Sequence, residues 1–341
     1  MFYVESKGCK GGGGIGLMRG SSEDAAVKLG GIGGDIMHST MSIPAITDRD
    51  VCMGGQACKR WKWSIPRLVV PQEEHRKGGH LSPKMASGRL LVLQTRRKEH
   101  WALPFWREPC NTPEGSSFSV EAGAPAGRSV GVVWSTDGGE SWGLRGEVRT
   151  LGAHVVESVL VERNDGKLLL LMHELHGGLH QAISGDMGRT WGSLERTSLP
   201  VADSSVAALK VHTGHLAMVF NAHGQLPRPL TYTRTLLDVA VSGDDGSSWR
   251  RIARLESHQV AGLQSHRASV LEVGAALYVL YTSELAQGVN DSTLLPLQHQ
   301  ESSVDANTQL GVRIAQVKLN VRLPALENDE CTYRVGDECM V

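Results

Sequence analysis

The sequence predicts an all-β fold, because its apolar residues gather in short runs that turn residues interrupt. SGRLLVL, DGKLLLLM and TGHLAMVF each place a glycine before such a run. Apolar runs of four to eight residues bounded by turn residues are typical of buried strands. Almost no stretch of the chain repeats its apolar residues at the period of an amphipathic helix. A motif that returns three times along the chain indicates that the strands form stacked units of similar size.

The composition excludes several classes of protein. The 341 residues include 35 Lys and Arg and 36 Asp and Glu, for a formal net charge of −1, so no nucleic-acid partner is expected. No apolar run approaches the roughly 18 residues that a membrane-spanning helix needs. The N-terminal MFYVESKGCK lacks the basic and apolar regions of a signal peptide. None of the six cysteines forms a C-x-x-C pair, so we expect no zinc ribbon, and cysteine usage leaves the redox compartment open. We expect no metal and no cofactor.

The repeated motif has the form S-x-D-x-G-x-[ST]-W. It begins at Ser135, Ser184 and Ser242, which gives intervals of 49 and 58 residues. The Asp and Ser side chains can accept hydrogen bonds from turn N–H groups, and the glycine allows a positive φ. The Trp can bury a large ring against a neighbouring sheet and satisfy its indole N–H locally. We therefore interpret the motif as a structural turn. Its fixed positions are Ser135, Asp137, Gly139, Trp142, Ser184, Asp186, Gly188, Trp191, Ser242, Asp244, Gly246 and Trp249.

The stretch HELHGGLH, residues 173–180, raises the alternatives of a zinc-binding helix and a β-hairpin. A zinc-protease helix needs H-E-x-x-H, whereas this chain has H-E-x-H followed by two glycines that would break a helix. Gly-Gly between two β-like runs is typical of a hairpin turn. The sequence therefore predicts one strand over 167–176 and the next over 179–184. The zinc alternative would use His173, His176, His180 and His223.

The three motifs resemble the Asp-box (BNR) repeats of the sialidase, or neuraminidase, superfamily. The resemblance covers roughly residues 64–319 and implies a six-bladed β-propeller, in which sheets are arranged radially. Four units are delimited in the sequence, at 64–142, 150–191, 200–249 and 255–319. We expect a poorly patterned N-terminal segment over 1–63, the propeller over 64–320 and a tail over 321–341.

Two further segments lack the repeat pattern. Residues 1–63 and 98–130 would have to supply the missing blades in divergent form, unless the sequence is incomplete. Residues 98–130 and 283–309 also have the character of long polar insertions, which on a propeller often shape the mouth of a pocket.

The resemblance implies hydrolysis of terminal sialic acids from glycoconjugates. In the family, three arginines hold the sugar carboxylate, a Tyr–Glu pair supplies the nucleophile and an aspartate acts as acid and base. Arginine suits this role because its planar fork binds a carboxylate bidentately and keeps its charge. A neutral tyrosine can attack an anionic sugar without the repulsion between two carboxylates.

The first part of the chain departs from the family pattern. WSIPRLVV places Ser64 where the family has the arginine of an R-I-P motif, and Arg67 is a candidate replacement. GRLLVLQTRR is similar to a family pattern that ends in arginine and indicates Arg96 as a cation of the pocket. Residues 98–134 contain no aspartate, so Glu121 is the candidate general acid.

The later units match the family better. ESVLVERNDGKLLLLMH places Glu157 at the glutamate that polarises the nucleophile and His173 at an expected arginine. Arg234, eight residues before the serine of the third motif, matches the third arginine, and Asn221 fits the edge of a pocket. His266 stands at the position of the nucleophilic tyrosine, where it could act as nucleophile or base through a changed mechanism.

The sequence therefore favours an exo-α-sialidase-like glycosidase that acts on terminal sialic acid or a related sugar. The alternative is a propeller that binds glycan or protein without hydrolysis, because Ser64, His173 and His266 replace family residues. The candidate catalytic residues are Glu157, His266 and Glu121. The candidate substrate-binding residues are Arg234, Arg96, His173, Asn221 and Arg67.

Overall fold

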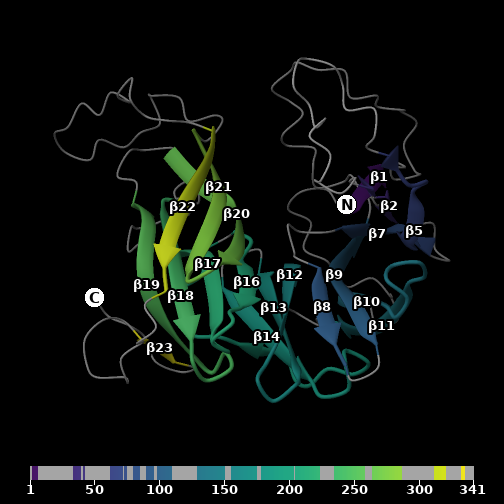
Figure 1. The fold of residues 1–341 in the computed structure, drawn as a ribbon, viewed down its shortest axis with the longest axis horizontal. Helices are drawn as coiled ribbons and strands as arrows, with labels where there is room; N and C mark the ends of the chain where they lie inside the picture. The colour runs from purple at the N-terminus through teal and green to yellow at the C-terminus, as the bar shows by residue number, and fades with distance from the viewer. Residues whose placement is uncertain are drawn as a thin grey trace, which may run out of the picture.

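The computed structural model describes part of the chain, and every element in that part is a strand (Figure 1). The described residues are 2–6, 34–39, 41–42, 62–71, 73–74, 80–84, 90–95, 98–109, 129–149, 155–174, 178–202, 204–222, 234–257, 263–285, 311–319 and 332–334. Several residues singled out above lie outside these ranges: Arg96, Glu121, His176, His223 and all six cysteines. The predicted all-β class is confirmed. Within the described ranges, no helix has the length and apolar character needed to cross a membrane.

Four large sheets make up most of the structure. Sheet I has the order β11-β10-β9-β7-β6, with β8 also paired to β9. Its strands are β6 (Glu73–Glu74), β7 (His80–Lys84), β8 (Leu91–Gln94), β9 (Glu99–Pro109), β10 (Ser129–Ser135) and β11 (Gly143–Arg149). Sheet II has the order β12-β13-β14-β15. Its strands are β12 (Val155–Glu162), β13 (Leu168–Glu174), β14 (Leu179–Ser184) and β15 (Glu195–Arg196).

The other two large sheets follow in chain order. Sheet III has the order β16-β17-β18-β19-β23, and sheet IV has the order β20-β21-β22. The strands of sheet III are β16 (Ala207–Lys210), β17 (Leu216–Ala222), β18 (Leu236–Ser242), β19 (Ser248–Ser257) and β23 (Thr332–Arg334). The strands of sheet IV are β20 (Leu263–Val273), β21 (Ala276–Leu285) and β22 (Gly311–Lys318).

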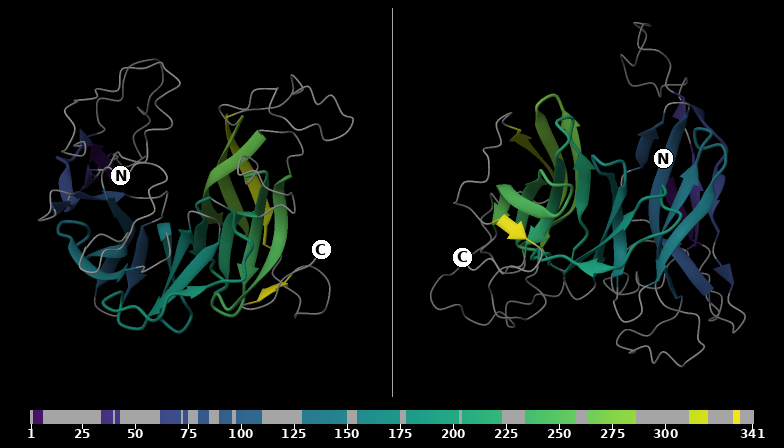
Figure 2. Two further views of the ribbon diagram at one scale, coloured as in Figure 1. Left: turned by 180° about the vertical axis from the view of Figure 1, so that it is seen from behind. Right: turned by 90° about the horizontal axis from the view of Figure 1, so that it is seen from below.

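The four large sheets follow one another side by side along an arc (Figures 1 and 2). Strand β12 contacts β16 and β16 contacts β20, so the first strands of sheets II, III and IV are neighbours. This is the radial arrangement of a propeller, and the four sheets correspond to the four units delimited in the sequence. Separate apolar clusters fill the space between consecutive sheets, as in face-to-face packing.

Residues near both ends of the chain pair with the large sheets or with strands beside them. β2 (Gly34–His38) lies between β1 (Phe2–Ser6) and β5 (Arg67–Val70) in a small sheet, whose residues form an apolar cluster with sheet I. His38 packs edge-on against Trp101 and Trp142 of sheet I, with ring centroids 6.2 and 5.9 Å away. A further pair joins β3 (Met41–Ser42) to β4 (Lys62–Trp63). At the other end of the chain, β23 pairs with β19.

The interpretation of residues 98–130 as a polar insertion is wrong for residues 99–109, which form β9 inside sheet I. One edge of β9 is shared by two short strands, since β8 pairs with Glu99–Ala102 and β7 with Trp106–Pro109. Pro104 falls in the gap between them, where β9 needs no donor on that edge. This placement lets a central strand contain a proline, which normally argues against such an assignment. The interpretation of 283–309 as an insertion is also wrong at its first residues, which end β21.

The stretch HELHGGLH is confirmed as a hairpin. β13 and β14 pair antiparallel, with His173 opposite Leu179. The Glu174 N–H donates to the Gly178 carbonyl at 3.1 Å and closes the turn. Residues 175–177 lie outside the described ranges.

Each copy of the repeated motif forms the same turn, which follows β10 in sheet I, β14 in sheet II and β18 in sheet III. In the second copy the Ser184 hydroxyl donates to Asp186 at 2.8 Å and accepts from the Gly188 N–H at 2.8 Å. The Asp186 carboxylate also accepts from the backbone and the hydroxyl of Thr190, at 2.9 and 2.6 Å. The first and third copies repeat these four hydrogen bonds. The predicted structural role of the three aspartates is therefore what the geometry shows.

Two successive residues of each turn have positive φ. Gly188 at 81° uses the freedom of glycine, whereas Met187 before it adopts 60° with a side chain. The turns also contact the preceding sheet. The Gly146 N–H of β11 donates to the Gly188 carbonyl at 2.7 Å, and a Cβ on Gly146 would lie 2.3 Å from the Arg189 carbonyl oxygen. Sheets I and II are thus in backbone contact at this turn.

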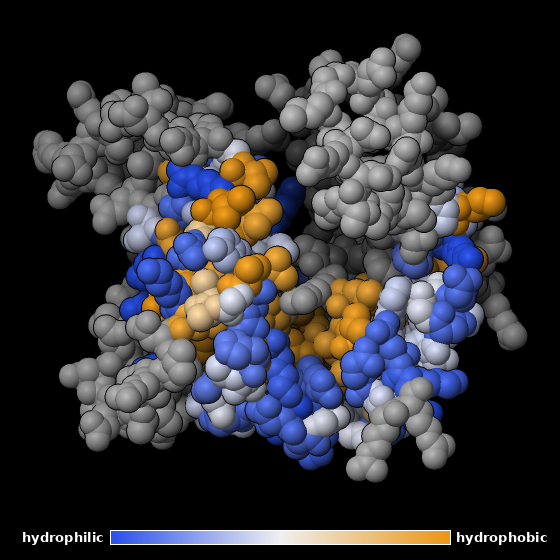
Figure 3. Space-filling model, viewed as in Figure 1, coloured by the Kyte–Doolittle hydropathy of each residue, from blue (hydrophilic) through white to orange (hydrophobic). Residues whose placement is uncertain are grey.

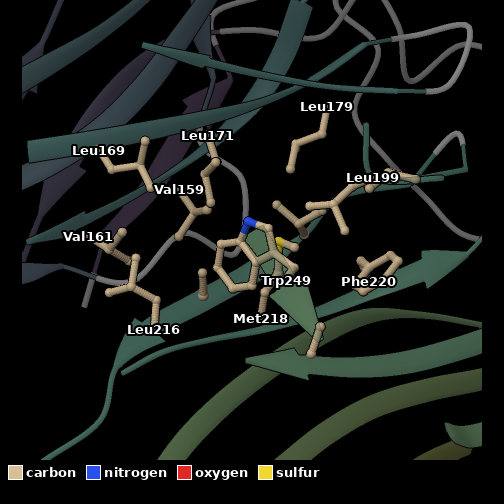
Figure 4. Packing of buried hydrophobic residues seen from close by; sticks show 14 of the residues in the cluster. Val159, Val161, Leu169, Leu171, Leu179, Leu199, Leu216, Met218, Phe220 and Trp249 are labelled. Atoms are coloured by element: carbon tan, nitrogen blue, oxygen red, sulfur yellow. The ribbon is translucent and has the colours of Figure 1, made fainter. Parts of the chain in front are cut away.

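The three tryptophans of the motif pack in different ways. The indole N–H of Trp142 donates within its own turn, to Gly139 at 3.1 Å, and that of Trp191 donates to Gly146 of sheet I at 3.0 Å. Trp249 is 2% exposed and lies among side chains of sheets II and III, including Val159 and Met218 (Figure 4). Its indole N–H has no hydrogen-bond partner in the described structure. The expectation of a locally satisfied N–H therefore holds for Trp142 alone.

Among the described residues, only one of the two faces of sheet IV is covered. Its inner face packs on sheet III through residues such as Val279 and Tyr281. Its other face exposes apolar side chains from all three strands, with Val312 74% and Ile314 67% exposed. Figure 3 shows apolar surface where β20 to β22 lie in the same view of Figure 1. The remaining large apolar residues of this face are Leu271, Val273 and Leu280.

Replacing Trp249 with alanine should destabilise the protein more than the same change at Trp142, because Trp249 is fully buried in its cluster whereas Trp142 is only partly buried at the margin of another. Truncating a fully buried Trp costs about 3–5 kcal/mol. We expect urea unfolding of Trp249→Ala to show a loss in this range, and Trp142→Ala to lose less than half as much. Equal losses would contradict the packing difference between the two turns.

The Asp186 carboxylate of the second Asp-box should stabilise the fold at neutral pH and lose this contribution as the solution becomes acidic. Hydrogen bonds from Thr190 and Ser184 lower the pKa of Asp186 from 3.8 to about 2. A carboxyl with a lowered pKa in the folded state contributes stability above its unfolded pKa, and this is lost as the pH falls toward the folded pKa. Asp186→Asn should therefore be less stable at neutral pH, with a flatter decline of urea stability between about pH 4 and pH 2. Thr190→Val should flatten the same decline in part, and an unchanged slope in both variants would refute the assignment.

Candidate functional site

The strand ends opposite the Asp-box turns bring several of the predicted site residues onto one end of the sheets. Ser184 and Ser242 mark the Asp-box end, which lies at the lower edge of Figure 1. His173 pairs near the other end of sheet II, and Arg234 and Asn221 lie at the other end of sheet III. We call the end of the sheets that carries His173, Arg234 and Asn221 the opposite end.

His266 lies between Arg234 and Glu284 in a hydrogen-bonded series. The Arg234 Nη1 lies 3.3 Å from the His266 Nδ1, and the His266 Nε2 lies 2.7 Å from the Glu284 Oε1. A guanidinium can only donate and an ionised carboxylate can only accept. The series is therefore satisfied when the imidazole is neutral, with its proton on Nε2 and its lone pair on Nδ1 facing Arg234.

Burial keeps His266 in this neutral form. The residue is 2% exposed, and burial is the main cause that lowers the pKa of its imidazole. The hydrogen bond to Glu284 acts in the other direction, and the charges of Arg234 and Arg267 lower the pKa further. With both ring nitrogens engaged, His266 is built to orient the Arg234 guanidinium.

Asn221 joins three strands at the same place. Its buried amide donates to the Leu236 carbonyl at 2.9 Å and to the Ser265 carbonyl at 2.7 Å. The Ser265 N–H in turn donates to the Arg234 carbonyl at 2.9 Å. Both protons of the amide are used in these contacts, which fix the backbone on either side of Arg234 and before His266.

Glu157 and His173 form a second pair at the opposite end of sheet II. The His173 Nδ1 lies 4.0 Å from the Glu157 Oε2, and His173 is buried. Glu157 is the extra residue of a β-bulge in β12, between Val156 and Ser158, and its φ is 37°. A side chain at positive φ is strained, and such strain is often found at functional sites.

Backbone contacts connect the two pairs across sheets II, III and IV. The Gly178 N–H, after the His173 strand, donates to the Val201 carbonyl at 2.8 Å. The Ala202 N–H donates to the Asn221 carbonyl at 2.8 Å, and Asn221 reaches sheet IV through Ser265. Glu157, His173, Asn221, Arg234 and His266 therefore belong to one connected region of the opposite end.

The structure does not bring Arg67 into this region. Its guanidinium pairs with Glu140 and contacts the Glu140 carbonyl at 3.3 Å, and Glu140 belongs to the first Asp-box turn. Arg67 is thus held at the Asp-box end. Arg96 and Glu121, the other candidates from the first part of the chain, lie outside the described residues.

Two features of the opposite end had no recognisable signal in the sequence. Glu284, which fixes His266, stands at the end of a strand with no motif around it. A Tyr–Glu pair also exists, in which the Tyr281 hydroxyl donates to the Glu256 Oε1 at 2.7 Å beside Arg313. Burial and then Glu256 raise the pKa of Tyr281 to about 12, which makes its phenolate hard to form. This pair joins sheets III and IV and does not supply an activated tyrosine.

The described residues contain no group of three or more His, Cys, Asp or Glu side chains arranged to hold a metal ion. His180, one of the histidines of the zinc alternative, is buried with its Nδ1 3.7 Å from the Glu174 Oε2. Burial lowers the pKa of His180, while the charge of Glu174 raises it.

The BNR repeat-like domain family matches residues 125–333, which is more than half of the chain. The chain belongs to the BNR repeat-like domain family. The matched residues contain all three Asp-box turns and the region around Arg234. The predicted repeat family is therefore confirmed. No curated protein sequence matches this BNR repeat-like chain significantly.

Solved structures similar to this BNR repeat-like chain include three sialidases. The NanB sialidase of Streptococcus pneumoniae is 16% identical, with 64% of this chain and 30% of that chain covered, at a TM-score of 0.43. Trypanosoma rangeli sialidase in complex with sialic acid is 15% identical, with 83% and 38% covered, at 0.45. The intramolecular trans-sialidase of Ruminococcus gnavus is 15% identical, with 65% and 43% covered, at 0.41. The chain thus spans less than half the length of each.

The protonation state of His266 can be tested by NMR titration of its ring protons. Arg234→Gln removes a neighbouring positive charge, so the pKa of His266 should rise. Glu284→Gln removes the hydrogen-bonded carboxylate, so the pKa of His266 should fall. The pKa of His180, which responds to Glu174 and Arg196, should stay unchanged in both variants. Shifts of the same sign at His266 in the two variants would contradict the series.

Proposed function

We propose that this BNR repeat-like protein is a sialidase-like glycoside hydrolase that acts on a terminal acidic sugar of a glycoconjugate. The observation that carries the proposal is the Arg234 guanidinium, which is half-buried and contacts the buried His266 imidazole, itself hydrogen-bonded to the half-exposed Glu284. A guanidinium held in a fixed direction is suited to bind a carboxylate, since its planar fork matches the two oxygens.

Glu157 is the proposed catalytic carboxylate. It lies at a strained bulge on the first strand of sheet II, and about a third of its side chain is exposed (34%), next to buried His173. A partly exposed carboxylate can polarise a nucleophile or a water molecule, as glycosidases require. His266 then acts as a positioning residue for Arg234. Glu121 remains the proposed general acid, and His173 and Asn221 are proposed to shape the site around Glu157 and Arg234.

A second candidate function is glycan binding without hydrolysis. It is favoured by the engagement of both ring nitrogens of His266, the residue that stands where the family has its nucleophile. The Tyr–Glu pair that the chain does contain has a raised tyrosine pKa and joins two sheets. A protein with this arrangement would keep the arginine that recognises an acidic sugar and lack an activated nucleophile.

Turnover of a fluorogenic α-sialoside by the purified chain distinguishes the two functions. If the chain is a hydrolase, Arg234→Ala should lower kcat/KM by roughly 10- to 100-fold, since a hydrogen bond to a charged group contributes about 1.5–3 kcal/mol. The control is Arg189→Ala, an exposed arginine of the second Asp-box turn, which should keep full activity.

Binding of sialyllactose without turnover, lost in Arg234→Ala, would support the second function and refute the first. An absence of both turnover and binding would refute both functions. Activity that is retained in Arg234→Ala would show that the carboxylate is not held by this arginine.

A further inference from the structure

The first Asp-box turn is contacted by the small sheet of β1, β2 and β5, whereas the second and third turns are contacted by sheets I and II. Apolar residues of the small sheet form one cluster with sheet I. Two polar residues, His38 of β2 and Arg67 of β5, stand opposite each other in the register of the small sheet. Arg67 pairs with Glu140 of the turn. The small sheet is therefore joined to sheet I by apolar packing and by a polar contact at the turn.

The imidazole of His38 is enclosed by the turn and by two indoles. His38 is 5% exposed, and its ring stands nearly perpendicular to those of Trp101 and Trp142, at interplanar angles of 82° and 81°. A Cβ on Gly139 would lie 3.0 Å from the His38 Cε1, so the ring lies against the backbone of the turn. We call the contact of His38 with the first Asp-box turn and the two indoles the His38 junction.

The surroundings of His38 oppose its protonation. Burial is the main cause that lowers the pKa of His38 from 6.5, and the positive charges of the N-terminus and of Arg67 lower it further. A hydrogen bond to the Gly139 backbone and the charge of Glu140 act in the other direction. The Glu140 carboxylate, however, is paired with Arg67. An imidazolium at this position would have to share that carboxylate with a guanidinium.

Two further carboxylates belong to the elements that pack on His38, and both are engaged by other donors. Asp137 accepts hydrogen bonds from the hydroxyls of Ser135 and Ser141 within the turn. Glu99 of β9 accepts a hydrogen bond from the Trp101 indole N–H. The faces of the two indoles can attract a cation, but a cation enclosed at the junction also loses its hydration.

We propose that the His38 junction is an acid-sensitive contact, which holds the small sheet on sheet I while the imidazole is neutral and releases it when the imidazole takes up a proton. The pKa of the docked His38 lies below that of an exposed histidine. The junction therefore stabilises docking fully above about pH 6.5, and this contribution is lost as the pH falls below that value. The proposal does not depend on the proposed function, because the junction lies at the Asp-box end.

Amide hydrogen exchange of the whole chain at several pH values, corrected for the intrinsic effect of pH on exchange, tests the proposal. Protection of β2 and β5 should fall by up to about tenfold per pH unit below about pH 6.5, because release takes up one proton. Protection of β17, inside sheet III, should stay unchanged over the same range. Protection of β2 and β5 that does not change with pH, or that falls in parallel with β17, would overturn the proposal.

His38→Phe keeps an aromatic ring against the two indoles but cannot be protonated. The protection of β2 and β5 should become independent of pH in this variant. The matched control is His212→Gln, which removes a histidine whose side chain is 59% exposed and should keep the pH dependence of wild type. Equal pH dependence in wild type and in His38→Phe would show that another group controls docking, and would overturn the proposal.

NMR titration of the His38 ring protons in wild type gives a readout that does not require His38→Phe to fold. A midpoint below about pH 6.5 is expected, and a midpoint at or above this value would overturn the proposal. Arg67→Gln should raise the midpoint, because it removes a positive charge beside the imidazole. An arginine that only braces the small sheet would leave the midpoint unchanged, and that result would overturn the electrostatic basis of the junction.

Discussion

The hydrogen bonds between serine and aspartate in the Asp-box turns are the contacts on which the arrangement of the sheets depends. In each copy the serine hydroxyl donates to the aspartate carboxylate and accepts a hydrogen bond from the backbone N–H of the motif glycine. Because the turn is fixed, its tryptophan and its backbone can reach the preceding sheet. Gly146 contacts the second turn in this way, and the Asp245 carboxylate of the third turn accepts from Asn164 of sheet II at 2.9 Å. A local motif thereby sets the spacing between sheets that are distant in sequence.

Much of this fold could be predicted from the sequence, because the information is local. The Asp-box turns and the hairpin after His173 are each specified by a few adjacent residues whose backbone preferences are strong. β9 was missed because its evidence is not local. Pro104 breaks the expected strand pattern, and its tolerance depends on β7 and β8 leaving a gap at that position. Such an arrangement is visible only once the partners of a strand are known.

The site could be predicted only in part, for a related reason. The position of Arg234 follows from its spacing to the third motif, and the structure shows it with His266. No spacing rule indicates that Glu284 completes the series, or that a bulge exposes Arg267 beside a buried histidine. Arg67 shows the opposite case, since a candidate chosen by its nearness in sequence is held by Glu140 at the other end of the sheets. The partners that a side chain meets on a neighbouring sheet depend on strand register and on the positions of bulges. Neither can be predicted from a single sequence.

The uncovered face of sheet IV has a consequence for how the molecule fluctuates. Each of sheets I to III has a packed neighbour on both sides, whereas the described part of sheet IV leans on sheet III alone. A unit with one neighbour opens at a lower free energy than a unit with two, so its amides exchange with solvent deuterium earlier. Sheet IV carries His266 and Glu284, and His266 contacts Arg234 at the edge of sheet III, so this contact joins sheet IV to the one described sheet that supports it. Opening of sheet IV would therefore separate His266 from Arg234 before it disturbs the packing between sheets I and II.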